Sequence, residues 1–198
     1  MNSSWRLKRE ERPEYAYYKN VFSKEDCDNI ITLGNNVITS TPLGTALVSG
    51  NNVAEPTIRK SKISWLLSNV EANRWLYEKL TVMVLDANNE YFNFDLHEIE
   101  SLQFTQYEGQ LGEFYTKHND INRGRSIIRK LSFSIQLTDP SDYSGGQLLL
   151  HTGHYPIVGP TELGSMTFFP SYVLHEVTPV IAGIRHSLVG WVNGPHFK

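Results

Sequence analysis

Residues 110–121 read Gln-Leu-Gly-Glu-Phe-Tyr-Thr-Lys-His-Asn-Asp-Ile and contain the pair His118 and Asp120. In an extended strand the side chains at i and i+2 point to the same face, so this imidazole and this carboxylate would reach one point. A second imidazole from another strand would complete a 2-His-1-carboxylate triad, which covers one face of an Fe(II) ion and leaves the other open. Taken alone, the pair is more simply a strand end with two exposed polar residues, because short motif matches carry a false-positive risk.

The sequence around this stretch predicts a mainly β architecture. From His97 onward, short β-rich runs alternate with turn clusters, and the runs cover residues 97–107, 112–118, 127–138, 146–151, 164–169, 172–177 and 181–192. Evenly spaced strands with turn signals are typical of a barrel or jelly roll, a class that includes cupin-type barrels. We therefore predict a double-stranded β-helix, jelly-roll or cupin-like, whose barrel spans about residues 97–193.

Two helices are expected before the barrel, in a support region of about residues 20–90. Ser23 followed by Asp26 resembles a helix N-cap, and Gly34-Asn35-Asn36 predicts the end of that helix, since Gly and Asn tolerate the left-handed conformation. The second helix is predicted from about 69 to 87. We expect both helices to back one sheet of the barrel.

The prediction of the second helix is based on a capping box and on the spacing of apolar residues. Ser68 and Glu71 form the box, the apolar residues beyond them recur at helical period, and Asn88-Asn89 would end the helix. Residues 39–56 have little period and predict a long surface loop, and residues 58–65 alternate enough for a strand.

Composition limits the classes of function. A chain of 198 residues and 22.6 kDa fits one domain, here taken as residues 1–198. A net charge of -3 and a pI near 6.2 argue against a nucleic-acid coat, and no apolar run has transmembrane length. Cys27 is the single cysteine, so a metal would need His and carboxylate ligands. Without a signal-peptide pattern, we expect a cytoplasmic bacterial or viral product.

The second region with chemistry covers residues 168–191. An isolated His175 is most simply a core or edge histidine satisfied by a neighbour. Arg185 follows ten residues later, and a strand, a turn and a return strand would bring it back near His175. An arginine on an inward barrel face is costly without an anion, and its planar fork suits a carboxylate. Ser187 shares the face of Arg185 and could add a hydroxyl donor.

This ordered set resembles the Fe(II)- and 2-oxoglutarate-dependent dioxygenases of the prolyl 4-hydroxylase type. The resemblance covers about two-thirds of the chain, with Asp120 and His175 separated by 55 residues. The matching residues are Arg59-x-Ser61, Trp65, Leu102-Gln-Phe-Thr-Gln-Tyr107, Gly109-Gln, Tyr115, His118-x-Asp120, Asp142-Tyr-x-Gly-Gly146, Phe169-Pro170, His175-x-Val-x-Pro-Val, Gly183, Arg185-x-Ser187 and Trp191.

The resemblance implies a role for each matching site residue. His118, Asp120 and His175 would be the iron ligands. Arg185, with Ser187, would hold the distal carboxylate of 2-oxoglutarate. The resemblance further places Tyr107 beside the co-substrate, although a packed aromatic on a barrel strand fits it nearly as well, and assigns a substrate-side segment to Arg59, Ser61 and Trp65.

Three positions depart from the strongest family patterns. Animal collagen hydroxylases usually have Lys where Arg185 stands, and Gln147 follows the Gly-Gly pair where Glu is common. The predicted strand at 127–138 offers Ser134 or Gln136, and no obvious tyrosine, as a further co-substrate contact. These departures concern the co-substrate and leave the metal site intact.

The implied activity is hydroxylation of an unactivated C–H bond with Fe(II), 2-oxoglutarate and O2, with ascorbate as a reductant. The expected substrate is a proline in a peptide or protein, over which the loop at 39–56 could fold. A free amino acid or small metabolite is the alternative substrate, and a non-catalytic cupin-like binding protein is the alternative class. No nucleic-acid or membrane partner is expected.

The remaining histidines and a basic cluster are weaker candidates. His151 and His154 form a His-x-x-His motif at a turn that could bind metal, whereas the other histidines predict surface or packing roles. Arg123 and Arg125, with Arg129 and Lys130, are most simply a solvated loop, or could meet an acidic or backbone-rich substrate.

Overall fold

The computed structural model describes residues 13–40, 57–121 and 127–197. The predicted loop at 39–56, apart from its first residues, and the basic residues Arg123 and Arg125 lie outside this part. Within the described ranges, no helix is both long enough and apolar enough to cross a membrane.

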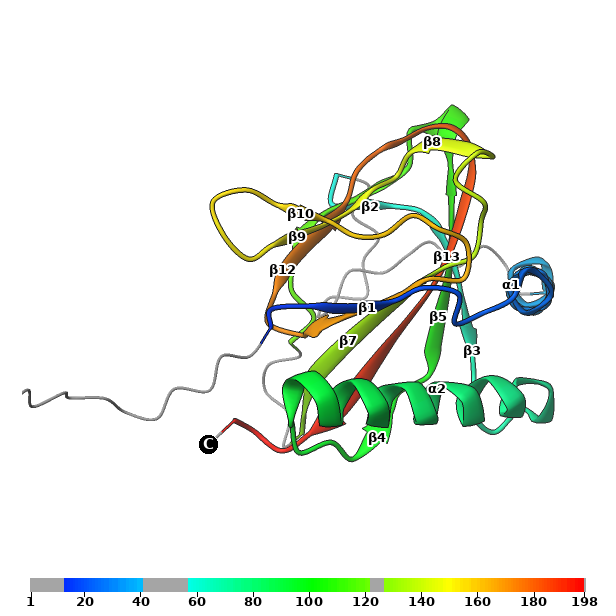
Figure 1. Ribbon diagram of the computed structural model, residues 1–198. Coiled ribbons are helices and arrows are strands. Elements are labelled where there is room, and N and C mark those ends of the chain that lie inside the picture. The colour runs from blue at the N-terminus through cyan, green and yellow to red at the C-terminus, as the bar shows by residue number, and fades with distance from the viewer. Residues whose placement is uncertain (1–12, 41–56, 122–126, 198) are drawn as a thin grey trace, which may run out of the picture.

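The described strands form two antiparallel sheets (Figure 1). The large sheet has the strand order β1-β11-β7-β13-β5-β3, and β4 and β8 also pair with β13. Its strands are β1 (Ala16–Tyr18), β3 (Lys62–Leu66), β4 (Glu98–Ile99), β5 (Leu102–Glu108), β7 (Ile128–Gln136), β8 (Tyr143–Gly145), β11 (Met166–Pro170) and β13 (Val180–Gly194). The small sheet has the order β10-β9-β12-β6-β2, with β2 (Arg59–Lys60), β6 (Phe114–His118), β9 (Leu148–His151), β10 (Ile157–Val158) and β12 (Leu174–Val177).

The predicted jelly roll is confirmed as a two-sheet arrangement. Among the described strands the sheets do not join into one closed hydrogen-bonded barrel. The predicted strand at 97–107 is divided between β4 and β5, and β10 was not predicted, because strands this short carry little alternation.

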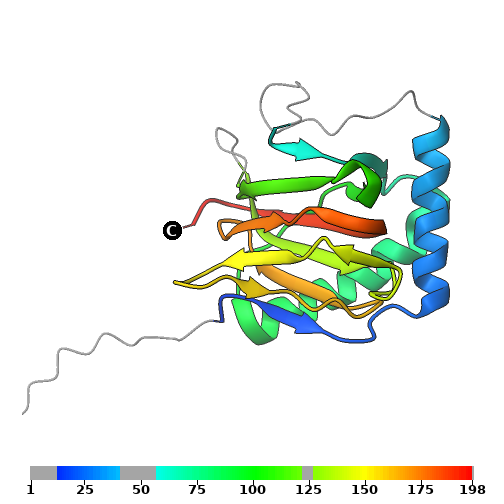
Figure 2. The same ribbon diagram turned by 90° about the horizontal axis from the view of Figure 1, so that it is seen from above.

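The main hydrophobic core lies between the large sheet and two helices, α1 (Lys24–Ser40) and α2 (Arg74–Ala87). Figure 2 shows α1 along one side of the sheets, roughly across the strand direction, with α2 beneath them. The core joins apolar residues of both helices to the outer face of the large sheet: Cys27, Ile30, Leu76, Leu80, Val84, Phe104, Phe133, Ile135, Phe168 and Leu188. The helices therefore back the large sheet, as the sequence predicted.

The inner face of the large sheet is largely polar. Only a small apolar cluster lies near the small sheet, formed by Leu148, Leu150, Phe169 and Val173. Buried polar side chains of β5, β7 and β13 fill the rest of the inner face: Gln103, Thr105, Ser132, Ser134, Gln136, Arg185 and Ser187. Because buried polar groups are costly unless paired, this interior has the character of a binding site.

Helix α1 begins as predicted but ends later. Ser23 and Asp26 form a reciprocal capping box, with Asp26 N donating to Ser23 Oγ at 3.1 Å and Ser23 N to Asp26 Oδ2 at 3.0 Å. The predicted end at Gly34-Asn35-Asn36 is wrong, since the helix runs on to Ser40. Gly34 is needed for packing: a Cβ there would come within 2.2 Å of the Phe104 ring.

Helix α2 ends at Ala87 as predicted, but it begins later than predicted and the chain stays helical beyond it. A 3₁₀ turn at Glu71–Asn73 precedes it, and neither helix start has a side-chain cap, so the capping box predicted at Ser68 is absent. Asn88 does not end the helix, because a π-helical turn at Asn88–Phe92 follows, closed by Asn93 with a left-handed φ of 51°. The Asn88 amide instead binds the backbone N–H and carbonyl of Phe94, both at 2.9 Å.

Candidate active site

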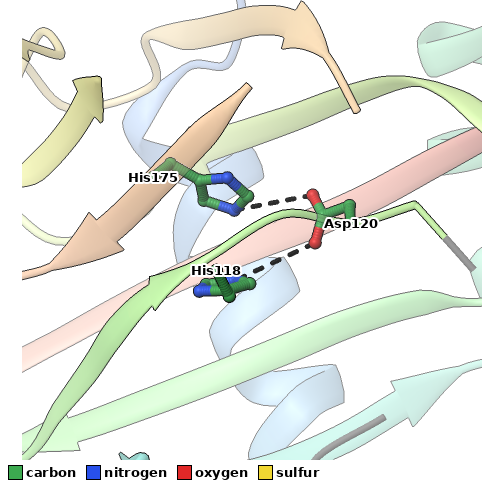
Figure 3. A group of neighbouring side chains, drawn as sticks. All are labelled: His118, Asp120 and His175. Atoms are coloured by element: carbon green, nitrogen blue, oxygen red, sulfur yellow. Dashed lines mark ion pairs between the residues drawn. The ribbon is translucent and has the colours of Figure 1, made fainter. Parts of the chain in front are cut away.

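Three potential metal ligands meet between the two sheets (Figure 3). His118 ends β6 and lies opposite His175 of β12 in the strand register, and Asp120 follows just beyond the end of β6. His118 Nε2 lies 3.8 Å from Asp120 Oδ1, and His175 Nε2 lies 3.5 Å from Asp120 Oδ2. All three ligand atoms lie within 4.8 Å of one another, close enough to share one ion.

Backbone carbonyls orient both imidazoles. His118 Nδ1 lies 2.8 Å from the carbonyl of Thr116, and His175 Nδ1 lies 2.9 Å from the carbonyl of Val173. In each case Nδ1–H donates to the carbonyl of the residue two positions earlier, which leaves the Nε2 lone pair directed at Asp120. Such a second partner fixes the tautomer that a metal requires. The sequence had not identified these partners.

The Asp120 carboxylate is held by two buried serines. Ser132 Oγ donates to Asp120 Oδ2 at 2.7 Å, and Ser132 and Ser171 hydroxyls are hydrogen-bonded at 2.9 Å. The backbone N–H of Asp120 donates to the Ser171 carbonyl at 2.9 Å. Sequence reasoning missed both serines, although the alternation of Ser132, Ser134 and Gln136 along β7 indicated an inward polar face.

The charges of the cluster suit a divalent cation. Burial, with a smaller contribution from the neighbouring His175, lowers the pKa of the His118 imidazole to about 3. Burial alone would raise the pKa of Asp120, but His175, His118 and the Ser132 hydroxyl together hold it below its usual value. The cluster thus offers two imidazoles and one carboxylate, which is the donor set of a 2-His-1-carboxylate Fe(II) site.

Arg185 is buried near this cluster, and no acidic side chain among the described residues forms an ion pair with it. Its side chain is 1% exposed, and its Nη1 lies 3.5 Å from Ser187 Oγ, at the limit of a hydrogen bond. Its guanidinium lies 5.5 Å from the ring centre of Tyr107, and its Nε has no hydrogen-bond partner in the described part of the chain. Because a buried guanidinium requires an anion, this geometry fits the distal carboxylate of 2-oxoglutarate.

One cavity contains the cluster and the arginine. Its lining joins both sheets and consists of Arg59, Gln103, Tyr107, Tyr115, His118, Asp120, Ser134, Leu148, Phe169, His175, Val177, Arg185, Ser187, Val189 and Trp191. Two residues, Ser134 and Gln136, were suggested for a further co-substrate contact. Ser134 lines the cavity and Gln136 does not.

The three residues of the predicted substrate side are placed differently. Arg59 lines the cavity, and Ser61 accepts a hydrogen bond from Arg59 Nε at 2.9 Å. Trp65 is 39% exposed and does not line the cavity. It packs against Trp191, which does line it, with 6.1 Å between ring centres.

The other histidines lie away from this cavity. His151 Nε2 contacts Glu176 Oε1 at 2.9 Å, and neither His151 nor His154 lines the cavity. His186 packs in a stacked arrangement on Phe104, with 5.5 Å between ring centres.

Comparison with known proteins identifies the class. The 2OG-Fe(II) oxygenase superfamily model matches residues 102–193. A PKHD-type hydroxylase of Crocosphaera subtropica is 30% identical over 176 residues, which cover 83% of this chain and 78% of the relative. Another from Idiomarina loihiensis is 27% identical over 170 residues, covering 83% and 77%. The chain belongs to the 2OG-Fe(II) oxygenase superfamily.

Solved structures of other proteins share this fold. A prolyl hydroxylase of Trichoplax adhaerens, in complex with a hypoxia inducible factor peptide fragment, superimposes with a TM-score of 0.76 at 21% identity, covering 90% of this chain and 83% of that one. A Pseudomonas putida prolyl-4-hydroxylase gives a TM-score of 0.72 at 21% identity, covering 92% and 94%. As a member of this superfamily, the protein is an oxidoreductase that uses Fe(II), 2-oxoglutarate and O2.

Proposed function

We propose that this oxygenase hydroxylates a proline residue in a peptide or protein. The observation that carries the co-substrate chemistry concerns Arg185. It is buried in one cavity with the cluster of His118, Asp120 and His175, and no described acidic side chain forms an ion pair with it. The choice of proline is supported by the similarity to prolyl hydroxylases, one of which is bound to a peptide fragment. Ascorbate is proposed as the reductant that maintains Fe(II).

Each residue has a defined task in this proposal. His118, Asp120 and His175 would hold Fe(II), which supplies the redox chemistry for O2 activation and C–H oxidation. Arg185 and Ser187 would bind the distal carboxylate of 2-oxoglutarate, with Tyr107 beside them. In the overall reaction one oxygen atom of O2 enters the new hydroxyl, and the other enters succinate as 2-oxoglutarate loses CO2.

The lining also has an apolar part. Leu148, Phe169, Val177 and Val189 contribute apolar side chains to it beside the polar groups. A drier site strengthens the electrostatic contacts that orient the co-substrate and limits side reactions.

The test compares peptides with free amino acids. Purified protein with Fe(II) and 2-oxoglutarate is incubated with capped proline-containing peptides or with free L-proline, and succinate and mass gain are measured. A gain of about 16 Da on the peptide is expected, as one oxygen atom is inserted. Turnover stimulated only by free amino acids would overturn the peptidyl assignment and favour a small-molecule hydroxylase.

A further inference from the structure

A second arginine, Arg59, is buried in the same cavity. It belongs to β2, is 6% exposed, and lies opposite Tyr115 of β6 in the strand register. Its guanidinium carbon lies 4.5 Å from the centre of the Tyr115 ring, and that ring stacks on His118 with 3.6 Å between ring centres. The guanidinium is therefore one aromatic ring away from a metal ligand.

The contacts of Arg59 are all with uncharged groups. Its Nε donates to Ser61 Oγ at 2.9 Å, and its Nη2 donates to Gln103 Oε1 at 2.8 Å and to Thr105 Oγ1 at 3.4 Å. Within the described chain no carboxylate forms an ion pair with it, and its Nη1 makes no hydrogen bond. These contacts fix the guanidinium in place without neutralising it, a costly state for a buried charge.

The charges of the cavity remain unbalanced after the co-substrate has bound. Arg59 and Arg185 face one acidic side chain, Asp120, among the residues of the lining, so the protein alone contributes one net positive charge. Fe(II) adds two positive charges, and the two carboxylates of 2-oxoglutarate remove two. Arg185 and the metal account for those two carboxylates, and the charge of Arg59 remains unpaired.

We propose that Arg59 binds a carboxylate of the substrate, so that the enzyme selects substrates with an anionic group close to the carbon that is hydroxylated. This proposal rests on the oxygenase function proposed above and defines its substrate more closely. The carboxylate has two possible sources, an acidic side chain next to proline in a peptide, or the α-carboxylate of a free amino acid or of a C-terminal residue. Charge-assisted hydrogen bonds from a guanidinium suit either source.

The first test uses matched ligands with the wild-type protein. Binding to the anaerobic enzyme loaded with Fe(II) and 2-oxoglutarate is measured by calorimetry. The pairs are acetyl-Ala-Pro-Glu-Ala-amide against its Gln analogue, and L-proline against L-prolinamide. The carboxylate member of at least one pair should bind about 10- to 100-fold more tightly, the effect expected of a charged hydrogen bond. The pair that shows this difference identifies the source.

The second test removes the charge. Arg59→Gln should abolish the difference within the pair, whereas Arg59→Lys should keep part of it. Both variants should bind 2-oxoglutarate as the wild type does, since that task is assigned to Arg185. Arg74→Gln is the matched control, because Arg74 is an exposed helix arginine paired with Glu78 at 2.9 Å. If Arg59→Gln does not fold, the ligand comparison with the wild-type protein still tests whether the enzyme prefers the carboxylate ligands.

Equal binding of carboxylate and amide members in both pairs, or no binding of any carboxylate, would overturn the proposal. A third pair, L-alanine and L-alaninamide, distinguishes failure of the Arg59 proposal from failure of the assignment of proline as the substrate. Discrimination between these two, lost in Arg59→Gln, with no oxidation of any proline compound would support Arg59 and refute proline as the substrate.

Discussion

Ser132 supplies a single hydroxyl that orients Asp120, the carboxylate that we propose binds the metal. It donates to Asp120 at 2.7 Å and is itself held by Ser171, and neither serine has measurable exposure. Ser132→Ala should therefore weaken Fe(II) or Co(II) binding by about 10-fold, within the range for residues that orient metal ligands. A metal titration by absorption or calorimetry checks this.

Ser64→Ala is the control for that prediction. Ser64 is also buried and donates a hydrogen bond, but to the Gly34 carbonyl of α1 at 2.9 Å, on the helix side of the large sheet. This variant should lose some stability and keep its metal affinity. Unchanged metal affinity in Ser132→Ala would show that Asp120 needs no such support.

Arg185 is the residue whose loss should affect the co-substrate most specifically. In Arg185→Gln the distal carboxylate would lose the guanidinium proposed to pair with it, so 2-oxoglutarate should bind about 30-fold more weakly or worse, which corresponds to about 2 kcal/mol. Calorimetry on the Fe(II) form measures it. Metal affinity should remain close to that of wild type, and a normal 2-oxoglutarate affinity would remove Arg185 from this role.

At the scale of elements, α1 packs on the large sheet through a glycine. A Cβ at Gly34 would lie 2.2 Å from the Phe104 ring, so the helix can approach β5 only without a side chain there. Gly34→Ala should destabilise the protein by about 1–3 kcal/mol, the usual effect of overpacking, despite the higher helix propensity of Ala. Thermal unfolding measures this loss.

Two variants make that prediction specific. Gly153 has open space around the position of an added Cβ, so Gly153→Ala should leave the melting temperature nearly unchanged. Reducing the ring in Gly34→Ala/Phe104→Leu should recover part of the lost stability, since the clash is with that ring. An additive double variant would contradict the packing explanation.

For the whole molecule, His186 should contribute to the dependence of stability on pH. Burial lowers its pKa to about 4, helped by the charge of Arg185, and its Nδ1 lies 3.1 Å from Thr138 Oγ1. The unfolded chain titrates near 6.5, so below that pH the unfolded state takes up a proton that the folded state refuses. Stability should fall as the pH drops from about 6.5 to 4, by at most about 3 kcal/mol.

Chemical denaturation of wild type and His186→Gln at several pH values tests this. The variant should lose less stability than wild type between pH 6.5 and 4, while the two should differ by a constant amount above pH 7. Parallel curves across the whole range would show that His186 does not carry this dependence.

Sequence patterns determined much of what could be predicted about the fold and the candidate site of this protein. Short strands separated by turn signals predicted the jelly roll, and the family resemblance carried by His118, Asp120, His175 and Arg185 predicted that these side chains form one site. These features are local or follow from the order of strands, so one sequence contains them. The capping box at Ser23 is local in the same way and was also predicted.

Tertiary structure alone decided features that depend on which strands pair and in what register. A shift of one residue moves a side chain to the other face of a sheet, so the sequence could not show that Ser132 meets Asp120. Likewise, Arg59 lines the cavity while Trp65 lies outside it, because β2 and β3 follow each other in the sequence but join different sheets. A ring 70 residues away in the sequence, that of Phe104, leaves no room for a side chain at Gly34, and no local pattern records this contact.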